Sequence, residues 1–304
     1  MNVIFSIQGG IGKSVMATAV CKAVKNNYPN SNLIVVTGYP EVFVNNPNVD
    51  MVFQHGQESY FYTKYVDGKE VKIMANEPYN ITEHLLFKEH TIETWCKMNG
   101  LVYSGEKPEI IINQREATYF MNKYNNIEKP IMILQTNGGA PTQDTVQMNP
   151  LAVKYSWARD MPKYVAEAVI ETFHQKYHIL HLRRDDQFSY ENTTHFSDSF
   201  KAVAFMIMRS EKRVLIDSFA QHTAAALLKP STVLWIANKP NVFGYPIHDN
   251  IIANPETAKP DLRFSFLSKY NITGAPNEFP YNDERDMFNV DRIIDSIMNQ
   301  PPSL

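Results

Sequence analysis

The chain has little of what marks several large classes of protein. Its two cysteines, Cys21 and Cys96, stand at unrelated positions, which gives neither a disulfide framework nor a zinc site and indicates a reducing compartment. No apolar run approaches the roughly 20 residues that span a bilayer. With 29 basic and 32 acidic residues, the net charge is −3, so there is no overall basic surface for nucleic acid. We therefore expect a cytoplasmic protein without a transmembrane segment or a metal site.

The patterns that are present predict two α/β domains. A chain of 304 residues exceeds the size at which single hydrophobic cores usually stop growing. Residues 2–36 read as a strand, a helix and a parallel strand. A polar run at 125–130 ends in Pro130 before a new apolar strand, and we place the boundary there. The predicted divisions are 1–128, 129–284 and a last helix within 285–304.

The second predicted domain contains a stretch that suits a ligand. Residues 214–216 form a short apolar strand, and Asp217, Ser218 and His222 follow before a helix of small residues. Ligands of open parallel sheets bind beyond the carboxyl ends of the strands, and a helix N-terminus favours an anion such as phosphate. In the alternative, purely structural interpretation, Ser218 caps the helix and His222 packs in the core.

A glycine turn, Gly-Gly-Ile-Gly-Lys-Ser at 9–14, follows the first strand. It resembles part of the phosphate-binding loop of ParA-like ATPases. The full pattern requires Gly-x4-Gly-Lys-Ser/Thr, and Ile7 stands where the first glycine belongs. No strand ending in a magnesium-binding aspartate is evident. A ParA-like ATPase is therefore an alternative interpretation of this turn.

More of the chain resembles the heptosyltransferase-like glycosyltransferases of family 9. The glycine turn, Tyr28-Pro29, a strand at 32–36 and Asn-Pro-Asn-Val-Asp at 46–50 occur in that family's order. The run from Asp217 to Ala226 resembles its motif D-[ST]-G-x-x-H-x-A-A, with Phe219 in place of the glycine. The resemblance implies the GT-B fold, in which two Rossmann-like domains face a central cleft and a C-terminal helix crosses back to the N-terminal domain.

The resemblance also implies an activity. The family transfers a sugar from a nucleotide-diphosphate sugar to a lipopolysaccharide-type glycan, with inversion and without a bound metal or other cofactor. The donor would bind mainly to the C-terminal domain and the acceptor to the N-terminal domain. Two alternatives remain open: an acceptor that is a modified base of phage DNA, and a relative that binds nucleotide sugar without catalysis.

Roles for individual residues follow from the resemblance. Arg159, three positions before Pro162, would neutralise the departing diphosphate. The other predicted donor-binding residues are Gly10, Gly12, Thr136, Asp217, Ser218, Gln221, His222, Thr223 and Asn238. The turn at 183–186, with two arginines and two aspartates, either contacts the nucleotide or pairs with itself.

The general base is the main departure from the family. The family has an aspartate directly after Gly-x-Gly, and this chain has Lys13 there. Because lysine is protonated at neutral pH, it is a poor base unless it is desolvated. The candidates for a catalytic role on the acceptor side are Lys13, Asp50, His55 and Glu58.

Two local predictions concern the rest of the first domain. Residues 60–65 and 70–74 flank Asp67-Gly68, which suits the type I′ turn of a β-hairpin. Their tyrosines and phenylalanine would pair across the strands or form a platform for an acceptor. Residues 81–99 read as one helix.

Overall fold

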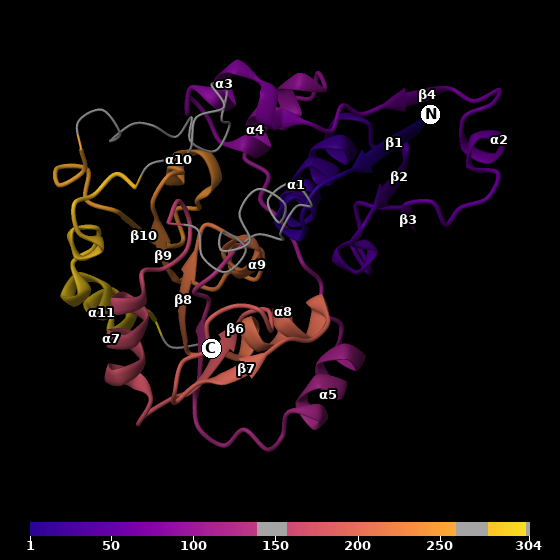
Figure 1. Ribbon diagram of the computed structural model, residues 1–304. Helices are drawn as coiled ribbons and strands as arrows, with labels where there is room; N and C mark the ends of the chain where they lie inside the picture. The colour runs from indigo at the N-terminus through magenta and orange to yellow at the C-terminus, as the bar shows by residue number, and fades with distance from the viewer. Residues whose placement is uncertain (139–156, 260–278, 302–304) are drawn as a thin grey trace.

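The computed structural model describes residues 1–138, 157–259 and 279–301. Its strands form two parallel sheets, one of four strands in the order β3-β2-β1-β4 and one of six in the order β10-β9-β8-β5-β6-β7. Each sheet carries helices of its own (Figure 1), and we call the two parts the N-terminal body and the C-terminal body. The predicted α/β class is confirmed.

The N-terminal body begins with the predicted strand, helix and strand. Its elements are β1 (Asn2–Ile7), α1 (Ile11–Asn27), β2 (Asn32–Thr37), η1 (Pro40–Val42), β3 (Met51–Gln54), α2 (Phe61–Tyr65), β4 (Val71–Ile73), η2 (Pro78–Asn80), α3 (Thr82–Leu85) and α4 (Thr91–Met98). Val3, Phe5 and Ile7 of β1 and Leu33 and Val35 of β2 pack in the core beneath α1 and α4, and the intervening Ile4 and Ile34 are buried as well. The carboxyl ends of these strands carry the glycine turn.

The predicted hairpin at 60–74 is wrong. The first arm is helix α2, and β4 pairs parallel with β1, with Asn2 opposite Val71. Phe61 and Tyr65 instead pack on Phe53 of β3, with ring centroids 6.0 and 5.7 Å away. The local turn signal was overridden because β4 completes the sheet beside β1, a long-range pairing.

The predicted single helix at 81–99 is also wrong, because it is interrupted. Phe87 has a φ of 53°, a left-handed conformation that a helix does not accommodate. A second helix, α4, then starts at His90, whose Nδ1 accepts a hydrogen bond from the Ile92 amide at 3.2 Å. The side chain of His90 therefore acts as an N-cap.

The C-terminal body is a doubly wound sheet. Its elements are β5 (Ile131–Leu134), α7 (Lys163–Phe173), β6 (His178–Leu182), β7 (Thr194–Phe196), α8 (Phe200–Arg209), β8 (Lys212–Ile216), α9 (Phe219–Ala226), β9 (Thr232–Trp235), α10 (Pro240–Phe243), β10 (Asp249–Ile252), η5 (Glu284–Asp286) and α11 (Val290–Met298). Helices α8 and α9 cover one face of the sheet, and α7 and α11 cover the other. Since β6 and β8 lie on opposite sides of β5, the strand order reverses between β5 and β8.

Two helices lie on a different body from the one that the sequence predicted. Helix α11 packs on α7, β8 and β9 of the C-terminal body, with Ile293 and Ile297 fully buried in that core. The expectation that the last helix crosses back to the N-terminal domain is therefore wrong. Helix α5 (Gln114–Lys123) also packs on the C-terminal body, where Phe120 lies 5.5 Å from Phe205. The chain thus passes from the N-terminal body to the C-terminal body before α5, whereas the predicted boundary at residue 128 lies after this helix.

The two bodies meet along α1 and α9, which lie side by side at the centre of the molecule (Figure 1). A Cβ atom on Gly12 would lie 3.2 Å from His222 Cδ2 and 3.3 Å from Phe219 Cα, so glycine permits this close approach. A second contact joins α10 to the N-terminal body, with Phe243 5.9 Å from Tyr79 and 5.2 Å from His84. The bodies are therefore joined by continuous packing.

Candidate active site

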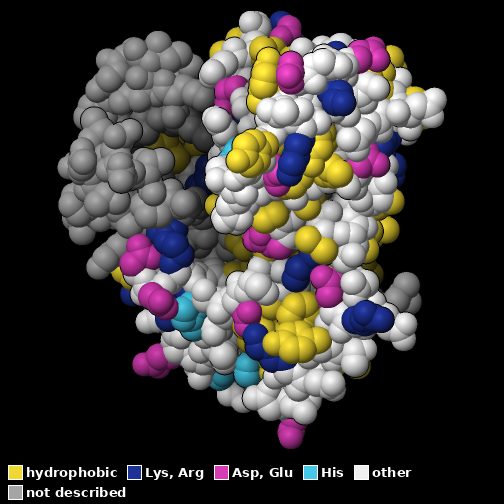
Figure 2. Space-filling view, turned by 90° about the vertical axis from the view of Figure 1, so that its right-hand side faces the viewer, with side chains coloured by type: hydrophobic (Ala, Val, Ile, Leu, Met, Phe, Trp, Pro, Cys, Tyr) yellow, Lys and Arg dark blue, Asp and Glu magenta, His cyan; other side chains and the backbone are white. Residues whose placement is uncertain are grey.

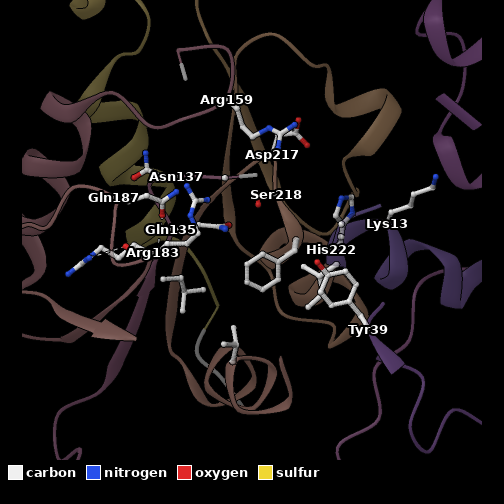
Figure 3. A pocket seen from close by; sticks show the side chains of 18 of the residues that line it. Lys13, Tyr39, Gln135, Asn137, Arg159, Arg183, Gln187, Asp217, Ser218 and His222 are labelled. Carbon is white, nitrogen blue, oxygen red and sulfur yellow. Dashed lines mark hydrogen bonds between the residues drawn. The ribbon is translucent and has the colours of Figure 1, made fainter. Parts of the chain in front are cut away.

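A cavity of about 500 Å³ lies between the carboxyl ends of the two sheets. Side chains from both bodies surround it (Figure 3). Its polar and glycine lining comprises Gly10, Gly12, Lys13, Tyr39 and Tyr79 of the N-terminal body, and Gln135, Asn137, Gly138, Arg159, Arg183, Arg184, Gln187, Ser197, Asp198, Asp217, Ser218 and His222 of the C-terminal body. A cavity of this size, with an apolar floor and a few convergent polar groups, is typical of a small-molecule site.

The C-terminal side of the cavity lies at the point where the strand order reverses. Asp217 and Ser218 follow β8, and Gln135 and Asn137 follow its neighbour β5. Chains leave these two strands in opposite directions, which opens a crevice at their carboxyl ends. The interpretation of 214–226 as a ligand-binding stretch therefore agrees with its place in the sheet.

The N-terminus of α9 opens onto this crevice. Ser218 is the N-cap residue, but its side chain makes no capping hydrogen bond, and the first turn has no acidic residue. The unsatisfied amides and the helix dipole at such an end attract an anion. This end of α9 is therefore suited to a phosphate group.

Arg159 lies beside this helix end. Figure 3 shows its side chain and that of Asp217 pointing toward each other. A Cβ atom on Gly138 would lie 2.7 Å from Arg159 Cδ, so glycine is needed for the arginine to occupy this place. Asp160 fixes the backbone that follows β5, because its carboxylate accepts hydrogen bonds from the Gly138 amide and from Asn137 Nδ2, both at 2.9 Å. Within the described ranges Arg159 forms no ion pair, which leaves its guanidinium available to a ligand.

Four of the predicted donor residues do not line the cavity but support it. Asn238 donates from Nδ2 to Asp217 Oδ2, and Gln221 Nε2 donates to the Phe243 carbonyl at 3.0 Å. The Thr223 hydroxyl donates to the Phe219 carbonyl at 2.9 Å. The Thr136 hydroxyl lies 2.7 Å from Asn137 Oδ1. These residues fix the backbone from which Asp217, Ser218 and His222 reach the cavity.

Lys13 is held away from the end of the cavity at which Arg159 lies. Its amine points away from Arg159 in Figure 3, and Nζ lies 2.9 Å from Glu77 Oε2 with only 4% of the side chain exposed. The same atom is 5.0 Å from the Tyr79 ring centroid and 5.4 Å from that of Trp95, within the range of cation–π attraction. The lysine charge is thus balanced inside the N-terminal body.

The other three predicted acceptor-side residues lie outside the cavity. Asp50 precedes the amino end of β3, whereas the cavity lies at the carboxyl ends of the strands. Its carboxylate accepts a hydrogen bond from Lys25 Nζ at 2.6 Å. His55 Nε2 lies 3.2 Å from the Ile7 carbonyl. Glu58 accepts from Lys64 Nζ at 2.7 Å. The structure therefore places none of these three residues in the cavity lining.

The sequence interpretation missed several residues that line the cavity. Gln135, Asn137 and Gly138 directly follow β5, and Gln187 lies in the turn after β6. Their position after a buried strand was the available signal. In the turn at 183–186 the self-pairing is observed, because Arg184 Nε donates to Asp186 Oδ1 at 3.0 Å. Both arginines also line the cavity, and contact with a nucleotide stays a prediction.

His222 belongs to a buried cluster at the contact between the bodies. Its Nδ1 lies 2.9 Å from the Tyr245 hydroxyl, and the rings of His90 and His248 lie 5.3 and 6.0 Å from the Tyr245 ring. Burial lowers the pKa of His222 to about 3 and the pKa values of His90 and His248 to about 4. All three rings are therefore neutral at pH 7.

Acid is expected to destabilise the protein through this cluster. Because the folded-state pKa values are depressed, the unfolded chain binds more protons between pH 6.5 and 4, and stability falls as the pH falls through that window. By pH 5 the loss is about 2 kcal/mol for each histidine. Urea denaturation at pH 7.5 and pH 5 should give a smaller difference for His248→Gln than for the wild type. The exposed His55→Gln is the control, and equal differences in all three proteins would contradict the expectation.

Comparison with known proteins identifies the fold. No protein-family model matches the sequence, and no curated protein matches it. The solved structure of Escherichia coli ADP-heptose LPS heptosyltransferase II is 13% identical, with a TM-score of 0.57 over 83% of this chain and 90% of that chain. A family 9 glycosyltransferase from Veillonella parvula is 12% identical, with a TM-score of 0.61 over 97% and 95%.

A third structure, E. coli heptosyltransferase WaaC with ADP, is 12% identical, with a TM-score of 0.50 over 84% of this chain and 94% of that chain. At these identities the likeness defines the fold. The chain has the GT-B fold of the heptosyltransferases and family 9 glycosyltransferases, and the fold predicted from the sequence is confirmed apart from the position of α11.

The described residues lack two features, a membrane-spanning helix and a cluster of metal-binding side chains. None of their helices is both long enough and apolar enough to cross a membrane. They also contain no group of three or more His, Cys, Asp or Glu side chains arranged to hold a metal ion.

Proposed function

We propose that the protein is a glycosyltransferase that moves a sugar from a nucleotide-diphosphate sugar to a glycan of the lipopolysaccharide type. One observation carries the proposal: Arg159, without an ion-pair partner in the described chain, stands beside the uncapped N-terminus of α9 where the strand order reverses. Phosphate binds where a helix N-terminus and an arginine converge. The names of two similar structures, which mention ADP-heptose and ADP, support the same ligand class.

The proposed mechanism uses charges that the protein already holds in position. The diphosphate would accept hydrogen bonds from the first-turn amides of α9 and from Arg159. As the bond to the sugar breaks, these groups stabilise the negative charge that develops on the leaving phosphate. No metal ion or other cofactor is assigned to this step, and attack from the N-terminal side would invert the sugar.

We assign the role of proton acceptor to Glu77. Glu77 does not itself line the cavity, but one of its oxygens receives a hydrogen bond from the Nζ atom of Lys13, a residue that does. The side chain of Glu77 is 43% exposed, so its carboxylate remains accessible to an acceptor hydroxyl. Lys13 thus holds the carboxylate of Glu77, which lies in the segment between β4 and η2, near the place where the family has its own aspartate. General-base catalysis by a positioned carboxylate follows.

A calorimetric titration tests the donor half of the proposal. ADP, GDP and UDP are titrated with and without EDTA, and ATP is titrated with and without Mg²⁺. We expect one diphosphate to bind with a Kd that EDTA does not change. Binding of ATP alone, and only with Mg²⁺, would instead support a ParA-like ATPase. The pairing of Lys13 with Glu77 already speaks against that alternative, because a phosphate-binding lysine must reach the ligand.

The face of the molecule seen in Figure 2 favours a glycan over DNA as the acceptor. On the face seen in Figure 2, basic and acidic side chains are interspersed among the described residues, without an area of basic groups alone. DNA binding draws most of its affinity from several lysines and arginines on phosphates. Transfer assays with glycan and DNA acceptors distinguish the two, and the absence of transfer to either would indicate a binding protein.

A further inference from the structure

Two aromatic side chains line the cavity from opposite bodies and have no aromatic partner. Tyr39 follows β2 of the N-terminal body, and Phe219 is the first residue of α9. Among the residues that the structure describes, neither ring contacts another ring, and the Tyr39 hydroxyl has no hydrogen bond. Both side chains are partly buried against the core. The part of each side chain that the core leaves uncovered lines the cavity.

The other aromatic side chains of the cavity are already engaged. Phe243 packs 5.9 Å from Tyr79, and Phe196 packs 5.5 Å from Tyr124. Aromatic rings commonly satisfy one another in this way. The two rings that lack such a partner are thus distinct within the lining.

Backbone contacts fix both rings in place. The Cα and Cβ atoms of Phe219 lie 3.3 and 3.5 Å from the position that a Cβ atom on Gly12 would occupy, and its carbonyl accepts from the Thr223 hydroxyl at 2.9 Å. The Tyr39 amide donates to Thr37 Oγ1 at 3.2 Å, and Pro40 follows. Side chains held in this way lose little conformational freedom when a ligand binds.

The position of Phe219 relates it to the phosphate end of the cavity. It follows Ser218 directly and belongs to the same helix turn whose amides suit a phosphate. A group bonded to that phosphate must therefore extend past the Phe219 ring. Aromatic faces stack on bases and on the apolar C–H faces of sugars. Tyr39 comes from the body opposite, from which an acceptor would approach.

We propose that Tyr39 and Phe219 form an aromatic clamp that holds the transferred sugar of the donor between them. The ligand class is a sugar ring with an exposed C–H face and a hydroxyl group able to hydrogen-bond the Tyr39 hydroxyl. This inference rests on the proposed function. The family motif has glycine at the position of Phe219, so the clamp is a feature of this chain rather than of the motif.

The clamp is tested by comparing a nucleoside diphosphate with its sugar conjugate. ADP, GDP and UDP are titrated beside ADP-glucose, GDP-mannose and UDP-glucose into the wild type, Phe219→Leu and Tyr39→Leu. Leucine keeps apolar volume but removes the aromatic face. We expect each variant to weaken the best-bound conjugate about 10-fold, while affinity for the diphosphate changes less than about 2-fold. Tyr39→Phe, which loses only the hydroxyl group, should weaken the conjugate less than Tyr39→Leu.

Phe188→Leu is the matched control, because Phe188 is an exposed ring of the same body that does not line the cavity. Unchanged Tm values exclude a folding defect in the variants. Equal losses for the diphosphate and the conjugate would mean that the nucleoside occupies the rings, and this overturns the clamp. Unchanged affinity for the conjugate overturns it as well. If the wild type binds no diphosphate at all, the proposed function fails and the clamp fails with it.

Discussion

Replacing Glu77 by glutamine is expected to lower the rate of sugar transfer at least 100-fold, the size of a typical general-base contribution. Glutamine keeps the shape of the side chain and its contact with the Tyr79 amide, but it cannot accept a proton. Affinity for the nucleoside diphosphate should remain within about 2-fold, because the diphosphate site lies on the C-terminal body. The expected loss is therefore confined to kcat.

The measurement is initial-rate kinetics of transfer, with kcat determined between pH 5 and 9. Glu77→Asp, which keeps a carboxylate, should retain more activity than Glu77→Gln. Glu58→Gln is the control, since Glu58 also pairs with a lysine of the N-terminal body, but that lysine, Lys64, does not line the cavity. Because Glu77→Gln leaves the buried Lys13 without its ion pair, the Tm of each variant is measured in parallel. A stable Glu77→Gln protein with wild-type kcat would remove Glu77 from the mechanism.

Replacing Arg159 by alanine is expected to weaken binding of the nucleoside diphosphate about 30- to 100-fold. A charge-assisted hydrogen bond contributes about 1.5–3 kcal/mol, and the planar guanidinium can give two such bonds to a phosphate. Lysine retains the charge but loses the two-pronged geometry, so Arg159→Lys should recover only part of the affinity.

Isothermal titration with the diphosphate measures this effect. Arg292→Ala is a suitable control, because Arg292 pairs with Asp249 at the surface and does not line the cavity. It should bind as the wild type does. Unchanged affinity in Arg159→Ala would show that the uncapped end of α9 binds the phosphates alone, or that the ligand lies elsewhere.

The strands and helices near the site could be predicted because their signals are local. Apolar runs followed by glycine or by small residues were sufficient for the units at 2–36 and 214–235. The hairpin at 60–74 failed because the parallel pairing of β4 with β1 joins residues about 70 positions apart, and no local pattern encodes it. The apolar stripe of α11 predicts burial but does not say on which body.

The site was predicted in part for a related reason. Phe219 and His222, three residues apart on α9, both line the cavity, and Ser218 lines it as the N-cap residue, whereas Gln221 and Thr223 do not. The motif predicts which helix lies at the site, but only the helical repeat distinguishes the residues that face the cavity from those that do not. The partner of Lys13 could not be predicted at all, because Glu77 reaches it from the start of η2, 64 residues along the chain.

The contact of α1 with α9 also determines how the molecule responds to ionic strength. Gly12, Phe219 and the neutral His222 make this contact without an ion pair, and dissolved ions screen charges rather than packed apolar surfaces. The proposed binding of phosphate to Arg159 depends on charge and should weaken as salt is added. We therefore expect the two bodies to stay together under salt conditions that release a nucleotide, so that ligand affinity and domain association respond to different variables.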